Sequence, residues 1–122
     1  MKLRILDNTL RWRLDRHEVD QLGAGTRLVA ETRFPGGEVF CYRIEVAGAE
    51  LTAIKDHHGI RLCLPEQQLA SWAADETQVG IYANLPLTEG CLALTIEKDF
   101  ECLDPREGEN QSNRFSNPKA AD

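Results

Sequence analysis

The chain has 122 residues, which fits one domain with a single hydrophobic core, and it carries a formal net charge of −6. This acidic balance argues against a nucleic-acid partner, because nonspecific nucleic-acid binding depends on clustered lysine and arginine side chains that neutralise phosphates. The first sixteen residues nevertheless sum to +3, so the remaining residues sum to −9.

The sequence predicts no targeting or membrane-spanning segment. The first eight residues mix apolar and charged side chains instead of forming the apolar run of about 7–15 residues that a signal peptide needs. No stretch approaches the ~18 apolar residues of a membrane span. We therefore expect a cytoplasmic protein with no membrane partner, in which the cysteines stay reduced. These are Cys41, Cys63, Cys91 and Cys102.

The chain begins with a predicted β-hairpin. Its strands, joined by an Asp-Asn turn, cover Lys2–Leu6 and Thr9–Leu14. Arg11 and Arg13 alternate with apolar residues in the second strand. Successive strand side chains point to opposite faces, so we expect these arginines on one face and Trp12 on the other.

Two short helices are predicted. Asp15 and Glu18 have the spacing of a capping box, which indicates that the first helix begins there, and Gly23 ends it. Pro65 suits the first turn of the second helix, because a missing N–H costs nothing at that position. The apolar face of this second helix includes Trp72 and should cover the sheet.

Alternating apolar residues between turn-forming sequences predict the remaining strands. These strands cover residues 27–34, 38–46, 51–56, 60–64, 78–83 and 91–100. We find no internal repeat of the solenoid type, and the successive hairpins indicate a meander. The predicted fold is α+β, a curved antiparallel sheet of about seven or eight strands, meander-like or barrel-like, with two short helices. Residues 1–103 form the predicted globular domain, and 104–122 form a polar tail, flexible or docked.

One face of the predicted sheet carries a set of charged residues. The candidate binding residues are Arg4, Arg11, Arg13, Arg43, Arg61, Glu97 and Asp99. Such alternation is typical of an antiparallel sheet whose exposed face carries cross-strand ion pairs, each worth about 0.2–1 kcal/mol. Alternatively, the strands curl into a barrel with the charged face inside, where arginine side chains would bind phosphate or carboxylate groups.

Metal ligation and catalysis find little support in the sequence. His57 and His58 are adjacent in a predicted turn, which is typical of a solvated turn, and no cysteine or histidine pair has zinc-ligand spacing. Cys102 follows Lys98 by four residues, but no histidine is placed beside it as a base. We predict no catalytic residue, no metal and no cofactor.

Several short motifs occur in a distinctive order along nearly the whole chain. They cover residues 2–5 (K-L-R-I), 10–14 (L-R-W-R-L), 18–22 (E-V-D-Q-L), 97–103 (E-K-D-F-E-C-L) and 115–118 (F-S-N-P). In these motifs the chain resembles an uncharacterised family of small bacterial proteins. Ser116 departs from the family pattern, which usually has proline there. The resemblance implies an organisation of the chain and no activity.

Together these patterns predict a non-enzymatic binding or protein-interaction module. The alternative is a binder or hydrolase of a phosphate-bearing or other anionic small molecule that uses the arginine-rich face. In architecture this alternative is similar to the charged eight-stranded tunnels that bind triphosphates, although the E-x-E-x-K motif of those proteins is absent.

Overall fold

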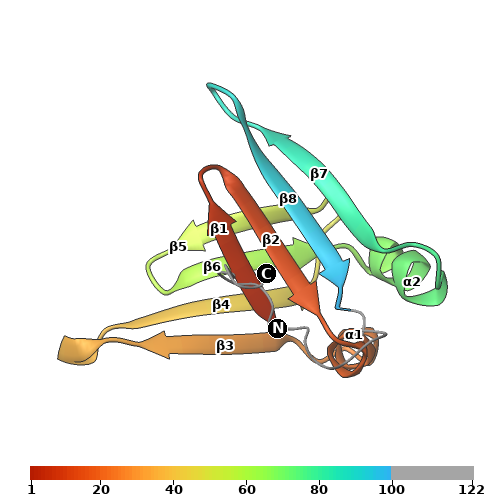
Figure 1. Ribbon diagram of the computed structural model, residues 1–122, viewed down its shortest axis with the longest axis horizontal. Helices are drawn as coiled ribbons and strands as arrows, with labels where there is room; N and C mark the ends of the chain where they lie inside the picture. The colour runs from red at the N-terminus through yellow and green to blue at the C-terminus, as the bar shows by residue number, and fades with distance from the viewer. Residues whose placement is uncertain (100–122) are drawn as a thin grey trace, which may run out of the picture.

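Eight strands and two short helices make up the fold in this computed structural model, which describes residues 1–99 (Figure 1). The elements are β1 (Lys2–Leu6), β2 (Thr9–Leu14), α1 (Arg16–Gly23), β3 (Leu28–Arg33), the 3-10 turn η1 (Pro35–Gly37), β4 (Val39–Val46), β5 (Thr52–Asp56), β6 (Gly59–Leu64), α2 (Glu66–Ala74), β7 (Gly80–Pro86) and β8 (Cys91–Lys98). The predicted tail, 104–122, and Cys102 lie outside the described residues.

The strands form two four-stranded sheets. Sheet A has the order β1-β2-β8-β7, and sheet B has the order β3-β4-β6-β5. Each sheet consists of two antiparallel hairpins joined through a central parallel pair, β2 with β8 in sheet A and β4 with β6 in sheet B.

The α+β class is therefore confirmed, but the single curved antiparallel sheet is wrong. The eight described strands form two mixed sheets and do not close into a barrel. The physical reason is that each helix carries the chain from one sheet to the other: α1 leads from β2 to β3, and α2 leads from β6 to β7. Side-chain alternation reports which face of a strand is buried and does not identify its neighbours.

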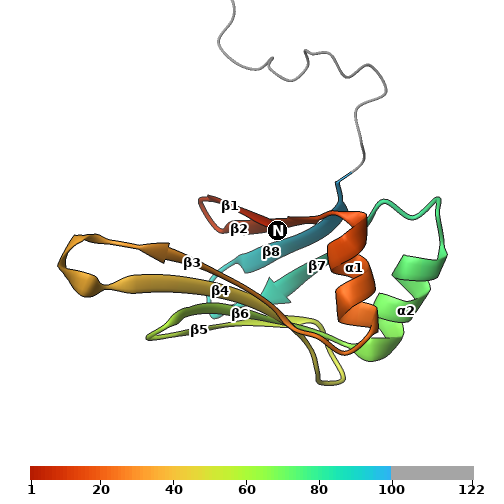
Figure 2. The same cartoon turned by 90° about the horizontal axis from the view of Figure 1, so that it is seen from below.

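The hydrophobic core lies between the two sheets and under the helices. Figure 2 shows the sheets as two layers, with α1 and α2 at one end. Trp12 and Leu14 of sheet A and Ile44 and Leu62 of sheet B are fully buried. The predicted phase of β2, with Trp12 inward and its arginines outward, is confirmed.

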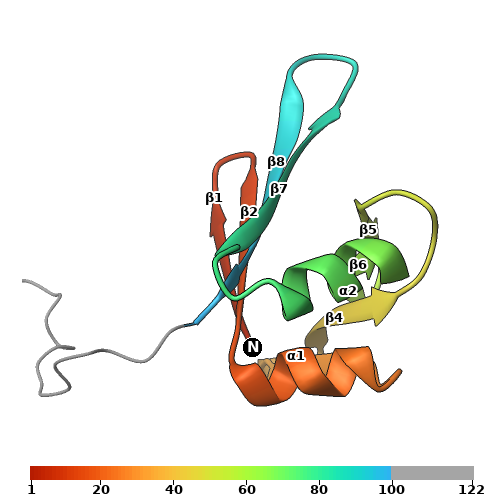
Figure 3. The same ribbon diagram turned by 90° about the vertical axis from the view of Figure 1, so that its right-hand side faces the viewer.

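The helices form where the sequence signals predict them. The capping box of α1 is complete: the Glu18 N–H donates to Asp15 Oδ1 at 2.8 Å, and the Asp15 N–H donates to Glu18 Oε1 at 3.0 Å. α2 follows Pro65 and buries Trp72. Figure 3, viewed from the helix end, shows the two helices together in front of the strands. Within residues 1–99, neither helix has the length and apolar character needed to cross a membrane.

The two halves of the described chain repeat one arrangement. Residues 2–46 and residues 52–98 each form two strands, a helix and two more strands. Sheet A combines the first hairpin of the first half with the second hairpin of the second half, and sheet B combines the other two. The molecule therefore has an internal twofold repeat in which the halves exchange hairpins.

The strand registers show how closely the halves correspond. Trp12 is paired with Ile96 across the parallel strands of sheet A, and Leu62 is paired with Ile44 in sheet B. Trp12 thus corresponds to Leu62, 50 residues later, and Ile44 corresponds to Ile96, 52 residues later.

A backbone contact at the hairpin turns repeats in the same way. The Ala93 N–H donates to Asn8 O at 3.0 Å, and the equivalent Cys41 N–H donates to His58 O at 2.8 Å. The repeat is one of topology and register, with little residue identity, so it leaves no periodic pattern in the sequence.

Candidate anion-binding face

The seven predicted site residues lie on the outer faces of two different sheets. The core fills the space between the sheets, so these outer faces point away from each other. Arg4, Arg11, Arg13 and Glu97 belong to sheet A, Asp99 follows its strand β8, and Arg43 and Arg61 belong to sheet B. The structure therefore brings five of the seven residues together and separates the other two. The single charged face that we predicted is divided because the single sheet is divided.

Four cations form a compact group on the outer face of the β1–β2 hairpin. Lys2 lies directly opposite Arg13 in the antiparallel register, and Arg4 lies directly opposite Arg11. The two rows are two residues apart along the strands, a separation of about 6.8 Å. We call Lys2, Arg4, Arg11 and Arg13 the basic cluster. They line a shallow hollow of about 270 Å³.

Two carboxylates partly neutralise the basic cluster. Glu97 Oε1 lies 3.4 Å from Arg11 Nε and 3.5 Å from Arg13 Nη2. Asp99 Oδ2 lies 3.5 Å from Lys2 Nζ. Arg4 forms no ion pair with another residue of 1–99. Among the described residues, the four cations and these two carboxylates leave an excess of two positive charges.

Arg43 of sheet B, unlike the residues of the basic cluster, is largely buried and is held in an ion pair. Its Nη2 donates to Asp56 Oδ2 at 2.9 Å, and its side chain is only 16% exposed. The hydrogen bond from Arg43, with further ones from the backbone N–H groups of His58 and Gly59, lowers the pKa of Asp56 to about 2. The pKa of Arg43 is raised by the same bond.

The ion pair between Arg43 and Asp56 lies beside a place where the backbones of β4 and β6 come unusually close together. A Cβ atom on Gly59 would lie 1.8 Å from the carbonyl oxygen of Cys41. Arg43 on β4 therefore reaches across strand β6 to Asp56 at the end of β5. We interpret Arg43 and Asp56 as a clamp that holds the β5–β6 hairpin to β4.

The internal repeat shows which charged residues of sheet A have charged equivalents in sheet B and which do not. Arg11 and Glu97 in sheet A correspond to Arg61 and Glu45 in sheet B, where Arg61 Nη1 lies 3.6 Å from Glu45 Oε1. Both sheets therefore keep one arginine–glutamate pair at the same place. The residues of sheet B at the positions of Lys2, Arg4 and Arg13 are Thr52, Ile54 and Cys63. The fold thus accepts neutral residues at three of the four positions of the basic cluster.

The histidines and cysteines of the described chain do not form a recognisable metal or thiol site. His57 and His58 lie in the β5–β6 turn, with ring centroids 4.4 Å apart. Cys63 is buried, and its Sγ lies 3.5 Å from Arg61 Nη1. Within residues 1–99, no three His, Cys, Asp or Glu side chains gather as metal ligands would.

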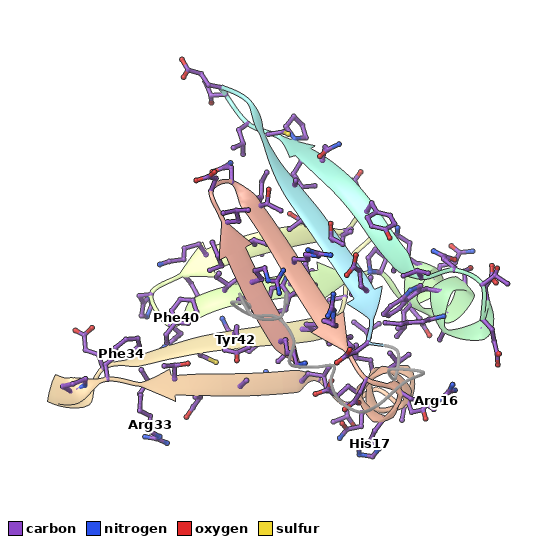
Figure 4. The ribbon with its side chains drawn as sticks, in the orientation of Figure 1. Arg16, His17, Arg33, Phe34, Phe40 and Tyr42 are labelled. Atoms are coloured by element: carbon purple, nitrogen blue, oxygen red, sulfur yellow. The ribbon has the colours of Figure 1, made fainter. Side chains whose placement is uncertain are left out.

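A larger hollow, which the sequence did not predict, lies at the helix end of the molecule. It has a volume of about 830 Å³ and lies between the start of α1, the end of α2 and the end of β8. Arg16 and His17 line it, and Figure 4 shows both projecting outward from α1. Lys98, also at its wall, donates to the backbone oxygen of Asp75 at 2.9 Å. This hollow results from the packing of helix ends, for which strand and helix periodicity give no signal.

The fold and this face define a two-sheet α+β protein with an internal twofold repeat and a basic cluster on one outer face. Residues 1–119 match the model of a family of unknown function (DUF7009), and the chain belongs to that family. The expected membership in an uncharacterised family is therefore confirmed. No curated protein and no solved structure matches the chain.

Proposed function

We propose that this protein is a non-enzymatic binding module that takes an anionic small molecule on the outer face of sheet A, through the basic cluster. The pairing of like charges across β1 and β2 carries the proposal. Lys2 faces Arg13 and Arg4 faces Arg11, and like charges directly opposite each other destabilise an antiparallel pair. A bound anion would convert this repulsion into attraction.

The comparison of the two halves supports the proposal independently. Thr52 and Ile54 occupy the positions of Lys2 and Arg4 in the other sheet, so neither cation is needed to form a hairpin of this kind. Charges that the fold does not require, and that repel one another, are explained by a ligand.

The exposure and chemistry of the cluster are suited to anion binding. The side chains of Arg11 and Arg13 remain 40% and 38% exposed, and that of Lys2 is 73% exposed. Each arginine offers five N–H donors in a planar fork that matches phosphate and carboxylate oxygens. Glu97 and Asp99, the carboxylates near the cluster, are engaged with these cations. This supports binding in preference to hydrolysis, which needs a base or a metal-bound water at the ligand.

The test uses one variant that removes a cation of the cluster and one that removes a matched cation elsewhere. Arg4→Ile introduces the residue found at the equivalent position of sheet B. Arg33→Ile makes the same chemical change on β3, where Arg33 is 79% exposed and pairs with Glu31 at 3.2 Å. Thermal unfolding is measured with sodium phosphate, pyrophosphate and citrate at fixed ionic strength.

A ligand at one hundred times its dissociation constant stabilises a protein by about 2.7 kcal/mol, or about 10–20 °C for a domain of this size. We expect such a shift for the wild-type protein and for Arg33→Ile, and a much smaller one for Arg4→Ile. The proposal is refuted if none of the three anions shifts the wild-type midpoint, or if Arg4→Ile keeps the full shift.

A further inference from the structure

The charge of the basic cluster limits the charge of its ligand. The cluster and its two carboxylates have an excess of two positive charges. A dianion would balance this excess, whereas a monoanion would leave part of the repulsion in place. A phosphate monoester has a charge of about −1.5 to −2 at pH 7 and presents three acceptor oxygens.

The dimensions of the cluster favour a single compact group. Its rows are about 6.8 Å apart along the strands, within the combined reach of lysine and arginine side chains. The hollow of about 270 Å³ is smaller than the pockets of about 300–1,000 Å³ that enclose drug-sized ligands. It therefore suits the charged end of a ligand and leaves the remainder of the molecule over the open face of the sheet.

Glu97 restricts where that group can bind. Its carboxylate is 15% exposed and contacts Arg11 and Arg13 from strand β8, on the side away from β1. A ligand is therefore directed toward Lys2 and Arg4 on the edge strand. Glu97 also repels additional negative charge, which disfavours anions with more than two charges.

We infer that the ligand is a phosphate monoester, bound by its dianionic phosphoryl group over β1, and that Glu97 is a positioning residue that sets the charge preference. This inference rests on the proposed function. It identifies the class of anion and the residue that selects it.

The first experiment is a calorimetric titration of the wild-type protein at fixed ionic strength and pH 7.5. Its probes are methyl phosphate, which is a dianionic monoester, and dimethyl phosphate, which is a monoanionic diester. We expect methyl phosphate to bind at least about tenfold more tightly, because it has one more unit charge in a partly exposed site. Equal affinities overturn the inference while leaving anion binding intact. Binding of neither probe, nor of pyrophosphate, overturns the proposed function as well.

The second experiment tests Glu97 against its equivalent in the other half. Glu97→Gln is expected to increase the affinity for pyrophosphate relative to methyl phosphate by about tenfold, because one repelling charge is lost. Glu45→Gln removes the equivalent carboxylate from sheet B and should leave the ratio unchanged. A ratio that is unchanged in Glu97→Gln, or that changes equally in both variants, refutes the role of Glu97. A purely structural effect would lower both affinities together.

Discussion

Trp12 and Trp72 are both fully buried, but their indole N–H groups differ. The Nε1 of Trp72 donates to the backbone oxygen of Val79 at 3.2 Å, whereas the Nε1 of Trp12 has no hydrogen-bond partner among residues 1–99. Replacing each tryptophan by phenylalanine should therefore give different losses of stability. Both replacements remove similar apolar area, so the difference between them reports what becomes of the two indole N–H groups.

The magnitudes follow from burial and hydrogen bonding. Truncation of a buried tryptophan to alanine costs about 3–5 kcal/mol, a large share of the 5–15 kcal/mol that typically stabilises a domain. Trp12→Phe removes part of this packing but also relieves an unsatisfied N–H, whose burial costs about 1–3 kcal/mol. Trp72→Phe removes packing together with a hydrogen bond worth about 0.5–1.5 kcal/mol. We expect Trp72→Phe to be the more destabilising by about 1.5–4.5 kcal/mol, because the two effects add.

Urea unfolding, monitored by circular dichroism, measures these free energies because the midpoint and slope give the unfolding free energy in water. Trp12→Ala serves as the reference for complete loss of the side chain, and it should unfold at a much lower urea concentration than Trp12→Phe. The reasoning is refuted if Trp12→Phe costs as much as Trp72→Phe. A near wild-type midpoint for Trp12→Ala would contradict the inward phase of β2 itself.

Three further predictions concern the clamp, the close approach and the basic cluster. Folding lowers the pKa of Asp56 to about 2, so the carboxylate stabilises the folded state above pH 4 and this stabilisation is lost as the pH falls toward about 2. The thermal unfolding midpoint of the wild-type protein should therefore fall more steeply over this pH range than that of Asp56→Asn. Gly59→Ala should be severely destabilising in thermal unfolding, because φ at this position is 146° and the added Cβ would collide with the backbone of Cys41. Gly90→Ala, which has no atom within 4 Å of the added Cβ, should lose only about 1–2 kcal/mol of stability. Similar losses in the two variants would contradict the register of β4 and β6. Without ligand at low salt, Arg4→Ile should raise the thermal unfolding midpoint slightly, because it removes cross-strand repulsion of about 0.2–1 kcal/mol. In 1 M NaCl this gain should disappear, because salt screens the charges. A midpoint below that of the wild-type protein at low salt would show that the cations do not repel one another.

Local features of this fold could be predicted from the sequence because local chemistry determines them. The capping box of Asp15 and Glu18, the hairpin of β1 and β2, and the inward phase of Trp12 depend on residues close together in the chain. The pairing of β2 with β8 joins residues more than 80 positions apart, and no turn determines it. The prediction of one sheet was wrong because long-range pairing depends on how the helices return the chain.

The candidate site was predicted in part for the same reason. Alternation placed Arg11 and Arg13 outward correctly, and the Asp-Asn turn brought Arg4 beside them. Arg43 and Arg61 have the same alternation, but they belong to the other sheet. Only the sheet topology shows which arginines share a sheet. Only the topology, likewise, shows that neutral residues occupy the equivalent positions in sheet B.

The exchange of hairpins between the halves bears on how far the outer faces of sheets A and B can differ in charge. Neither half contains a complete sheet, so a chain of half this length could form the same fold only as a pair of identical chains. In such a homodimer both outer faces carry the same residues, and a cation gained on one is gained on the other. In a single chain that contains both halves, each half has residues of its own and this constraint is absent. Lys2 and Thr52 are then independent positions, and one outer face can carry cations at positions where its counterpart is neutral.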